Sequence, residues 1–104
     1  MAKVMEKTNS LEKALKLIGK KYDLLILDAL LQGRRKRRFN QLLKDIPNIN
    51  PRILSMRLKE LEKNNLVVKS IVLGTPVKTE YSLTEKAEEL VEIIEKIKQW
   101  VDKN

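Results

Sequence analysis

The stretch NINPRILSMRLKELEKNNLVVKS, residues 48–70, carries the clearest structural signals in the chain. Asn50 followed by Pro51 is typical of a helix start. The asparagine side chain can accept a hydrogen bond from a free N–H group, and proline has no N–H at the first helical position, where it would be unpaired. A pair of asparagines ends the leucine-rich segment, and LVVKS after it has the composition of a strand. We therefore predict a helix over about residues 51–63.

This predicted helix has two different faces. Leu54, Leu58 and Leu61 are spaced by four and three residues, which predicts one stripe that packs on a core. At about 100° per residue, the opposite face carries polar and charged side chains and one methionine. A polar outer face is usually only solvated, so its meaning depends on the neighbouring elements.

The flanking segments predict further helices and a hairpin. Apolar spacing before the stretch predicts a first helix that begins near Ser10, a nearly all-apolar second helix over residues 22–31 at the centre of the fold, and a third helix from Phe39. After the stretch, two β-leaning runs are separated by Gly-Thr-Pro, which predicts a hairpin with a short loop. Thr84 is expected to cap a last helix that runs to Val101.

The order of these elements predicts the fold class. A chain of 104 residues has room for one domain with one core. We predict a mainly α protein with a small β-hairpin, which is a winged helix-turn-helix, over residues 1–104. Its parts are expected to be the N-terminal helices (10–31), the helix-turn-helix (39–63), the wing (66–83) and a C-terminal dimerisation helix (84–103).

The composition excludes most enzyme classes. The chain has no cysteine and no histidine, so it lacks a thiolate nucleophile, a thiol redox sensor and the commonest general base and zinc ligand. Glu88, Glu89, Glu92 and Glu95 lie at helical spacing among lysines, which is typical of a solvated helix face. There is also no Gly-rich phosphate loop. We therefore predict a protein that is not an enzyme and uses no metal or cofactor.

The apolar segments are too short for a membrane protein. No apolar run approaches the ~20 residues of a membrane span. The N-terminal sequence MAKVMEKTNS lacks the apolar core of a signal peptide. We therefore expect a cytoplasmic, nucleoid-associated protein with no membrane partner.

The excess positive charge is concentrated in one region. The formal net charge is +8, and residues 34–63, with ten Lys/Arg and three Asp/Glu, hold a net of +7. Charge confined in this way is the electrostatic footprint of a polyanion partner. The run RRKRR, residues 34–38, cannot be buried and is expected in a turn or short exposed strand. The basic run, the polar helix face and the hairpin are consecutive and each is positive, which predicts double-stranded DNA as the partner.

The predicted elements suggest how DNA would be contacted. A recognition helix lies in the major groove with its N-terminal residues at the base edges. Arginine and lysine donate to guanine or phosphate, serine bonds either partner, and methionine touches a thymine methyl group. The basic run would add phosphate contacts, which position a protein without specifying sequence. The candidate DNA-binding residues are Asn50, Arg52, Ser55, Met56 and Lys59 on the helix, Arg34, Arg35, Lys36, Arg37 and Arg38 in the basic run, and Lys69, Thr75 and Lys78 on the wing.

Four segments form a specific combination: ALKLIGKKYDLLILDALLQG, RFNQL, NPRILSMRLKELEKNNLV and TPVKTEYSLTEKA. Together they resemble the HxlR family of winged-helix transcription regulators, of the MarR-like superfamily, over nearly the whole chain from about Leu11. The resemblance implies a homodimer on a pseudo-palindromic operator, with the first and last helices in the dimer contact. It implies a recognition face at residues 50–59 and a wing at residues 69–78. The chain departs from the family in lacking the N-terminal cysteine with which many members sense oxidants or electrophiles, so that switch is excluded.

The last predicted helix supports a dimer independently. Its apolar residues form a band wider than one stripe, whereas one stripe is enough to pack a helix on a domain of this size. The alternative is a broad core helix in a monomer. If a dimer forms, its two recognition helices are expected about 34–36 Å apart. The candidate dimer-interface residues are Leu11, Leu15, Leu90, Ile94, Ile97, Trp100 and Val101.

Other functions remain open at this point. A nonspecific architectural DNA-binding protein would show steep salt dependence and little sequence preference, with the basic run dominating. A winged-helix protein-interaction module would have little reason to concentrate positive charge in the helix-turn-helix. An RNA-binding role is less well supported, because only four aromatic residues are present and no stacking platform is visible.

Overall fold

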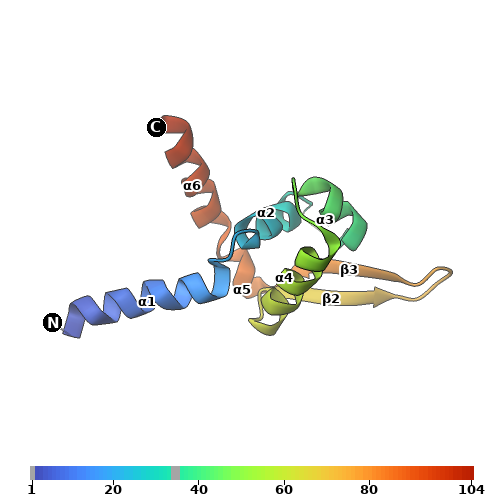
Figure 1. Cartoon of the computed structure of the whole chain (residues 1–104), viewed down its shortest axis with the longest axis horizontal. Helices are drawn as coiled ribbons and strands as arrows, with labels where there is room; N and C mark the ends of the chain where they lie inside the picture. The colour runs from blue at the N-terminus through green and yellow to red at the C-terminus, as the bar shows by residue number, and fades with distance from the viewer. Residues whose placement is uncertain (1, 34–35) are drawn as a thin grey trace.

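The computed structural model describes residues 2–33 and 36–104. Its strands form one antiparallel sheet in the order β1-β3-β2. Helices α3 and α4 form a helix-turn-helix, and β2 and β3 form the wing beside it (Figure 1). The predicted fold class is confirmed, and β1 adds a third strand to the expected hairpin. The elements are α1 (Ala2–Ile18), α2 (Asp23–Gly33), β1 (Arg37–Arg38), α3 (Phe39–Asp45), α4 (Pro51–Lys63), β2 (Val67–Val72), β3 (Lys78–Leu83), α5 (Glu85–Glu88) and α6 (Val91–Lys103).

The core lies between α2, α3, α4 and the inner half of the sheet. Helix α2 is central, as predicted, and its residues Ile26, Leu27 and Leu30 are fully buried. The leucine stripe of α4 packs against them, which confirms the predicted buried face. Leu25 is 46% exposed, however, so α2 is not covered on every side as expected. This exposure arises because Leu25 lines an open groove between α2 and the end of α3.

The wing is only partly supported by the body of the protein. Strands β2 and β3 pair from Val67 opposite Leu83 to Val72 opposite Lys78. Val67 and Tyr81, near the inner end, are buried against the core. The outer half of the hairpin projects past α3 and α4 (Figure 1). Its apolar residues Ile71 and Val72 are accordingly exposed, at 63% and 40%.

Two predicted helix boundaries are wrong. Helix α1 begins at Ala2 and not near Ser10. The prediction relied on a serine cap, but the preceding residues include the good helix formers Ala, Met, Lys and Glu, which extend the helix. The expected single last helix is divided into α5 and α6. The division is a tight turn in which the Leu90 N–H donates to the Ala87 carbonyl over 2.9 Å, three residues back instead of four.

Thr84 forms the predicted cap at the start of α5. Its hydroxyl oxygen accepts a hydrogen bond from the Ala87 N–H at 3.1 Å. The same hydroxyl donates to the Asn65 carbonyl at 2.7 Å. Asn65 itself has a positive φ of 62°, which asparagine tolerates better than most residues. The cap therefore connects the end of the α4 segment to the segment that leads into α6.

Candidate nucleic-acid interface

Helix α4 begins at the predicted cap. The Asn50 side chain accepts a hydrogen bond from the Ile53 N–H at 2.8 Å, and Pro51 occupies the first helical turn. The turn before α4 is stabilised by a contact with a distant residue. Asn48 in this turn has a positive φ of 64°, and its carbonyl accepts a hydrogen bond from the Tyr22 hydroxyl at 3.1 Å. The Asn50 side chain is therefore occupied in holding the helix, although the residue remains exposed.

A buried ion pair fixes α4 against α2. Asp23 is completely buried, and the Arg57 side chain is 15% exposed. Arg57 Nε lies 2.8 Å from Asp23 Oδ1, and Arg57 Nη2 lies 3.1 Å from Oδ2. The Lys20 backbone N–H donates to the same Oδ2 at 2.9 Å. This bidentate arginine–carboxylate geometry fixes both the position of α4 and its rotation about its axis.

The pair of Asp23 and Arg57 was not predicted from the sequence. Asp23 was given no role, and Arg57 was counted only in the net charge of residues 34–63. Two local signals were available. Asp23 is a carboxylate beside a strongly apolar segment, and Arg57 borders the buried leucine Leu58. An isolated acid and an isolated base, each next to core positions, are candidates for a buried pair.

The outer face of α4 presents the predicted side chains to solvent. Arg52, Met56 and Lys59 are exposed, and Met56 is 54% exposed. Ser55 is half-buried at the edge of this face. Within residues 2–33 and 36–104, neither Arg52 nor Lys59 has an ion-pair partner. These two cations are therefore available to an external anion or base.

The basic run is not a uniform set of free cations. Lys36 and Arg38 are exposed. Arg37 is half-buried and pairs with Asp45 at the end of α3, so part of its charge is satisfied within the chain, and its DNA contact stays a prediction. The pairing occurs because β1 places Arg37 beside the helix that follows it. Arg34 and Arg35, also predicted to bind phosphate, lie outside the described residues.

The three predicted wing residues occupy different positions on the hairpin. Lys69 lies on β2, exposed, opposite Tyr81 of β3. Thr75 is exposed in the loop between the strands. Lys78 is half-buried at the start of β3. The two lysines therefore add positive charge to the hairpin, one on each strand.

Tyr81, which is buried at the inner end of the wing, is expected to make the stability of the protein depend on pH. Burial raises the pKa of the Tyr81 phenol above its usual 10.0, and the negative charge of Glu62 raises it further. The contribution of neutral Tyr81 to stability is then fully present below about pH 10 and is lost as pH rises through the folded-state pKa. We expect urea titrations to show a smaller loss of stability between about pH 9 and pH 11 in Tyr81→Phe than in the wild type. An equal loss in both proteins would contradict this assignment.

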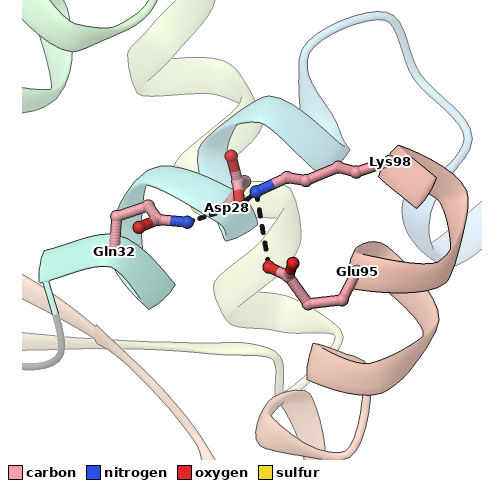
Figure 2. A network of polar contacts seen from close by, with 4 residues as sticks. All are labelled: Asp28, Gln32, Glu95 and Lys98. Atoms are coloured by element: carbon pink, nitrogen blue, oxygen red, sulfur yellow. Dashed lines mark hydrogen bonds and ion pairs between the residues drawn. The ribbon is translucent and has the colours of Figure 1, made fainter. Parts of the chain in front are cut away.

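A polar network attaches α6 to α2 (Figure 2). Lys98 Nζ lies 2.7 Å from Asp28 Oδ1 and 3.4 Å from Glu95 Oε1. Gln32 Nε2 donates to the same Asp28 oxygen at 3.4 Å. The hydrogen bond to Asp28 is the main cause of a raised Lys98 pKa. Helix α2 thus contacts α4 through one carboxylate and α6 through another.

The candidate dimer residues separate into two groups. Leu11 and Leu15 on α1 are 64% and 55% exposed. On α6, the exposed fractions are 44% for Ile97, 67% for Trp100 and 57% for Val101. Both helices project from the body (Figure 1). These five residues are therefore surface residues of the single chain.

Two other dimer candidates belong to the core. Ile94 is 7% exposed and joins the chain's own buried cluster, while Leu90 is half-buried against it. We therefore correct the assignment of Ile94, because the base of α6 packs on α2 before the helix leaves the body. Leu90 keeps part of its surface exposed, and its place in a dimer interface stays a prediction. A groove of about 310 Å³ lies between α1 and this base, lined largely by apolar residues such as Leu17 and Ile18.

Comparison with known proteins agrees with the helix-turn-helix geometry. The model of the HxlR-like helix-turn-helix family matches residues 17–104. The chain belongs to this family. The HTH-type transcriptional regulator YodB of Bacillus subtilis (strain 168) is 38% identical over 92 residues, which cover 88% of this chain and 80% of YodB. A regulator of the same type from Methanothermobacter thermautotrophicus is 35% identical over 91 residues, covering 88% and 68% of the two chains.

The solved structures of similar proteins give the same result. The redox regulator HypR in its reduced form superposes with a TM-score of 0.83 at 33% identity, covering 91% of this chain and 92% of HypR. The family prediction is confirmed, and this chain is a helix-turn-helix transcription regulator and not an enzyme. Among the described residues, no helix is long and apolar enough to cross a membrane.

Proposed function

We propose that the protein is a sequence-specific, double-stranded DNA-binding regulator that acts as a homodimer. The recognition helix, about residues 51–63, enters the major groove, and the wing over residues 69–78 lies on the backbone or in the minor groove. The observation that carries this proposal is the outer face of α4. It presents Arg52, Met56 and Lys59 to solvent while the Arg57–Asp23 pair and the Asn50 cap hold the helix rigidly from behind.

The roles of the side chains follow from their chemistry. Arg52, in the first turn of α4, is placed to donate to the O6 and N7 atoms of a guanine. Met56, one turn further along, offers an apolar contact to a thymine methyl group. Lys59 lies further from the helix start and suits a base edge or a phosphate. Lys36 and Arg38 on one side and Lys69 on the wing would contact phosphates, which set orientation without reading sequence.

The dimer is proposed on separate grounds. Leu11 and Leu15 on α1, with Ile97, Trp100 and Val101 on α6, leave apolar surface exposed on two projecting helices. A second copy of the chain would cover this surface with the same residues, as a two-fold interface requires. The two copies of α4 would then lie about 34–36 Å apart, which matches successive major grooves of a pseudo-palindromic operator.

The proposed regulator has no cysteine switch. HypR is described as a redox regulator, but the 104 residues of this chain contain no cysteine. These 104 residues therefore offer no thiol on which such a switch could act. We place the protein in the cytoplasm, associated with the nucleoid, because its proposed ligand is chromosomal DNA.

The proposal is tested by fluorescence anisotropy. Duplexes recovered by the protein from a random pool are labelled and titrated at several salt concentrations, with unlabelled random duplex as competitor. We expect two chains per duplex and binding that survives the random competitor. Equal competition by random duplex would instead favour the architectural protein. Absence of binding even at low salt would favour the protein-interaction module.

A further inference from the structure

Three exposed apolar side chains lie near the tip of the wing, and strand alternation places them on the same face as Lys69. Side chains alternate across a strand, so Ile71 of β2 shares a face with the buried Val67 near the base of the hairpin. Continued outward, the same alternation places Leu73 and Val77, which flank the loop, on this face. Their exposed fractions are 63% for Ile71, 85% for Leu73 and 59% for Val77. The face that joins the core at one end is therefore left open to solvent at the other.

Neither the fold nor phosphate binding explains this surface. The outer hairpin projects past α3 and α4, so no helix of the described part of the chain lies over it (Figure 1). Phosphate oxygens are bound by cations and N–H groups, and aliphatic side chains offer neither. An exposed apolar strand at a sheet edge also favours aggregation, which proteins usually avoid with charged residues. The apolar tip therefore points to a partner that accepts aliphatic side chains.

We propose that the tip of the wing is an apolar wedge that enters the DNA minor groove and bends the duplex. Leu73, the most exposed of the three residues, is the side chain expected between two base pairs, with Ile71 and Val77 against the sugars on either side. Apolar wedges of this type partly unstack a base step and bend DNA by about 20–90° toward the major groove. This inference rests on the proposed function, because it requires the hairpin to lie on DNA.

The surroundings of the tip favour DNA over a protein partner. Lys69 shares the face of Ile71, and Lys78 lies with Val72 on the opposite face, so a cation suited to a phosphate stands beside the tip on each face of the hairpin. Strand β2, which leads to the tip, packs against α4, the helix that presents Arg52 and Lys59. Three aliphatic side chains also provide far less area than the roughly 800 Å² per partner of a stable protein interface.

The shape of the hairpin agrees with a wedge. Its strands are about 4.8 Å apart between backbones, whereas the minor groove is about 6 Å wide. With side chains added, only the end of the hairpin fits, and the groove must widen to admit it. Pyrimidine–purine steps such as TA and CA unstack most easily. We therefore expect these steps to be enriched where the wing meets the operator, at positions that α4 does not contact.

The bend is measured by energy transfer between dyes at the two ends of a selected duplex. We expect the wild type to shorten the end-to-end distance and L73A to leave it close to that of free DNA, with affinity reduced by no more than about tenfold. L73M keeps a long apolar side chain and should retain the bend. V72A is the matched control, because Val72 is 40% exposed on the opposite face of the same strand.

The possible results separate the wedge from the proposed function. A wild type that binds the selected duplex without bending it overturns the wedge and leaves sequence-specific binding intact. The same conclusion follows if L73A bends DNA as strongly as the wild type. If L73A instead changes the oligomeric state in sedimentation, the tip contacts protein and the wedge is rejected. If the wild type binds no duplex, the proposed function is contradicted and the wedge is contradicted with it.

Discussion

Replacement of Arg57 by alanine is expected to lower the free energy of unfolding by about 3–5 kcal/mol. The reason is that Asp23, completely buried, would lose two charge-assisted hydrogen bonds and keep only the Lys20 N–H. A buried carboxylate without its cation is far more costly than the loss of a surface pair. Urea denaturation at one fixed protein concentration measures the change, since dimerisation would otherwise shift the midpoint.

Two further variants make the test specific. Arg52→Ala lies on the same helix but on its exposed face, and we expect its effect on stability to stay within about 0.5 kcal/mol. The double variant with Asp23→Leu and Arg57→Met removes both charges, and we expect it to be more stable than Arg57→Ala alone. If Arg57→Ala destabilises no more than Arg52→Ala, the buried pair does not hold α4 in place.

Replacement of Trp100 by alanine is expected to weaken dimerisation by about 2 kcal/mol or more, which is roughly a thirtyfold increase in the dimer dissociation constant. Large aromatic residues near the centre of an interface contribute most of the binding energy, and Trp100 is the largest exposed apolar residue on α6. Sedimentation over a range of concentrations measures the constant. Gln99→Ala is the matched control, because this exposed neighbour is turned away from the apolar stripe.

The wild-type protein provides a second measurement of the same surface. Trp100 is the only tryptophan of the chain, so its fluorescence reports on this position alone. We expect the emission to shift to longer wavelength on dilution, as the ring passes from the dimer interface into water. A protein that sediments as a monomer at every concentration, with unchanged emission, would contradict the proposed interface.

Elements with local signals were predicted well from the sequence. Helix α4 begins at Asn50-Pro51 and ends at the asparagine pair, as expected, because capping and hydrophobic spacing act over a few residues. The hairpin was predicted for the same reason. The break between α5 and α6 at Leu90 was not predicted, because no glycine or proline marks it in the sequence. The turn there coincides with the packing of Leu90 against the core, which is a tertiary contact.

Contacts between distant segments were not predictable in this way. Asp23 and Arg57 are 34 positions apart in sequence, and the residues around each of them do not identify its partner. Arg37 was assigned to DNA because charge counts do not distinguish a free cation from one paired with Asp45. Hydrophobic spacing likewise placed Ile94 and Trp100 in one band, although one is core and the other surface. The two residues can be told apart only once the position of α6 on the body of the protein is known.

The central claim is that the outer face of α4 contacts bases. The most direct test compares wild type and Arg52→Ala by competition anisotropy on the selected duplex and on random duplex. We predict that the variant loses about 1–3 kcal/mol on the selected duplex, binds random duplex almost unchanged, and accepts more than one base at a single position. An Arg52→Ala protein that folds normally and binds the selected duplex with wild-type affinity would contradict the assignment of α4 as the recognition helix.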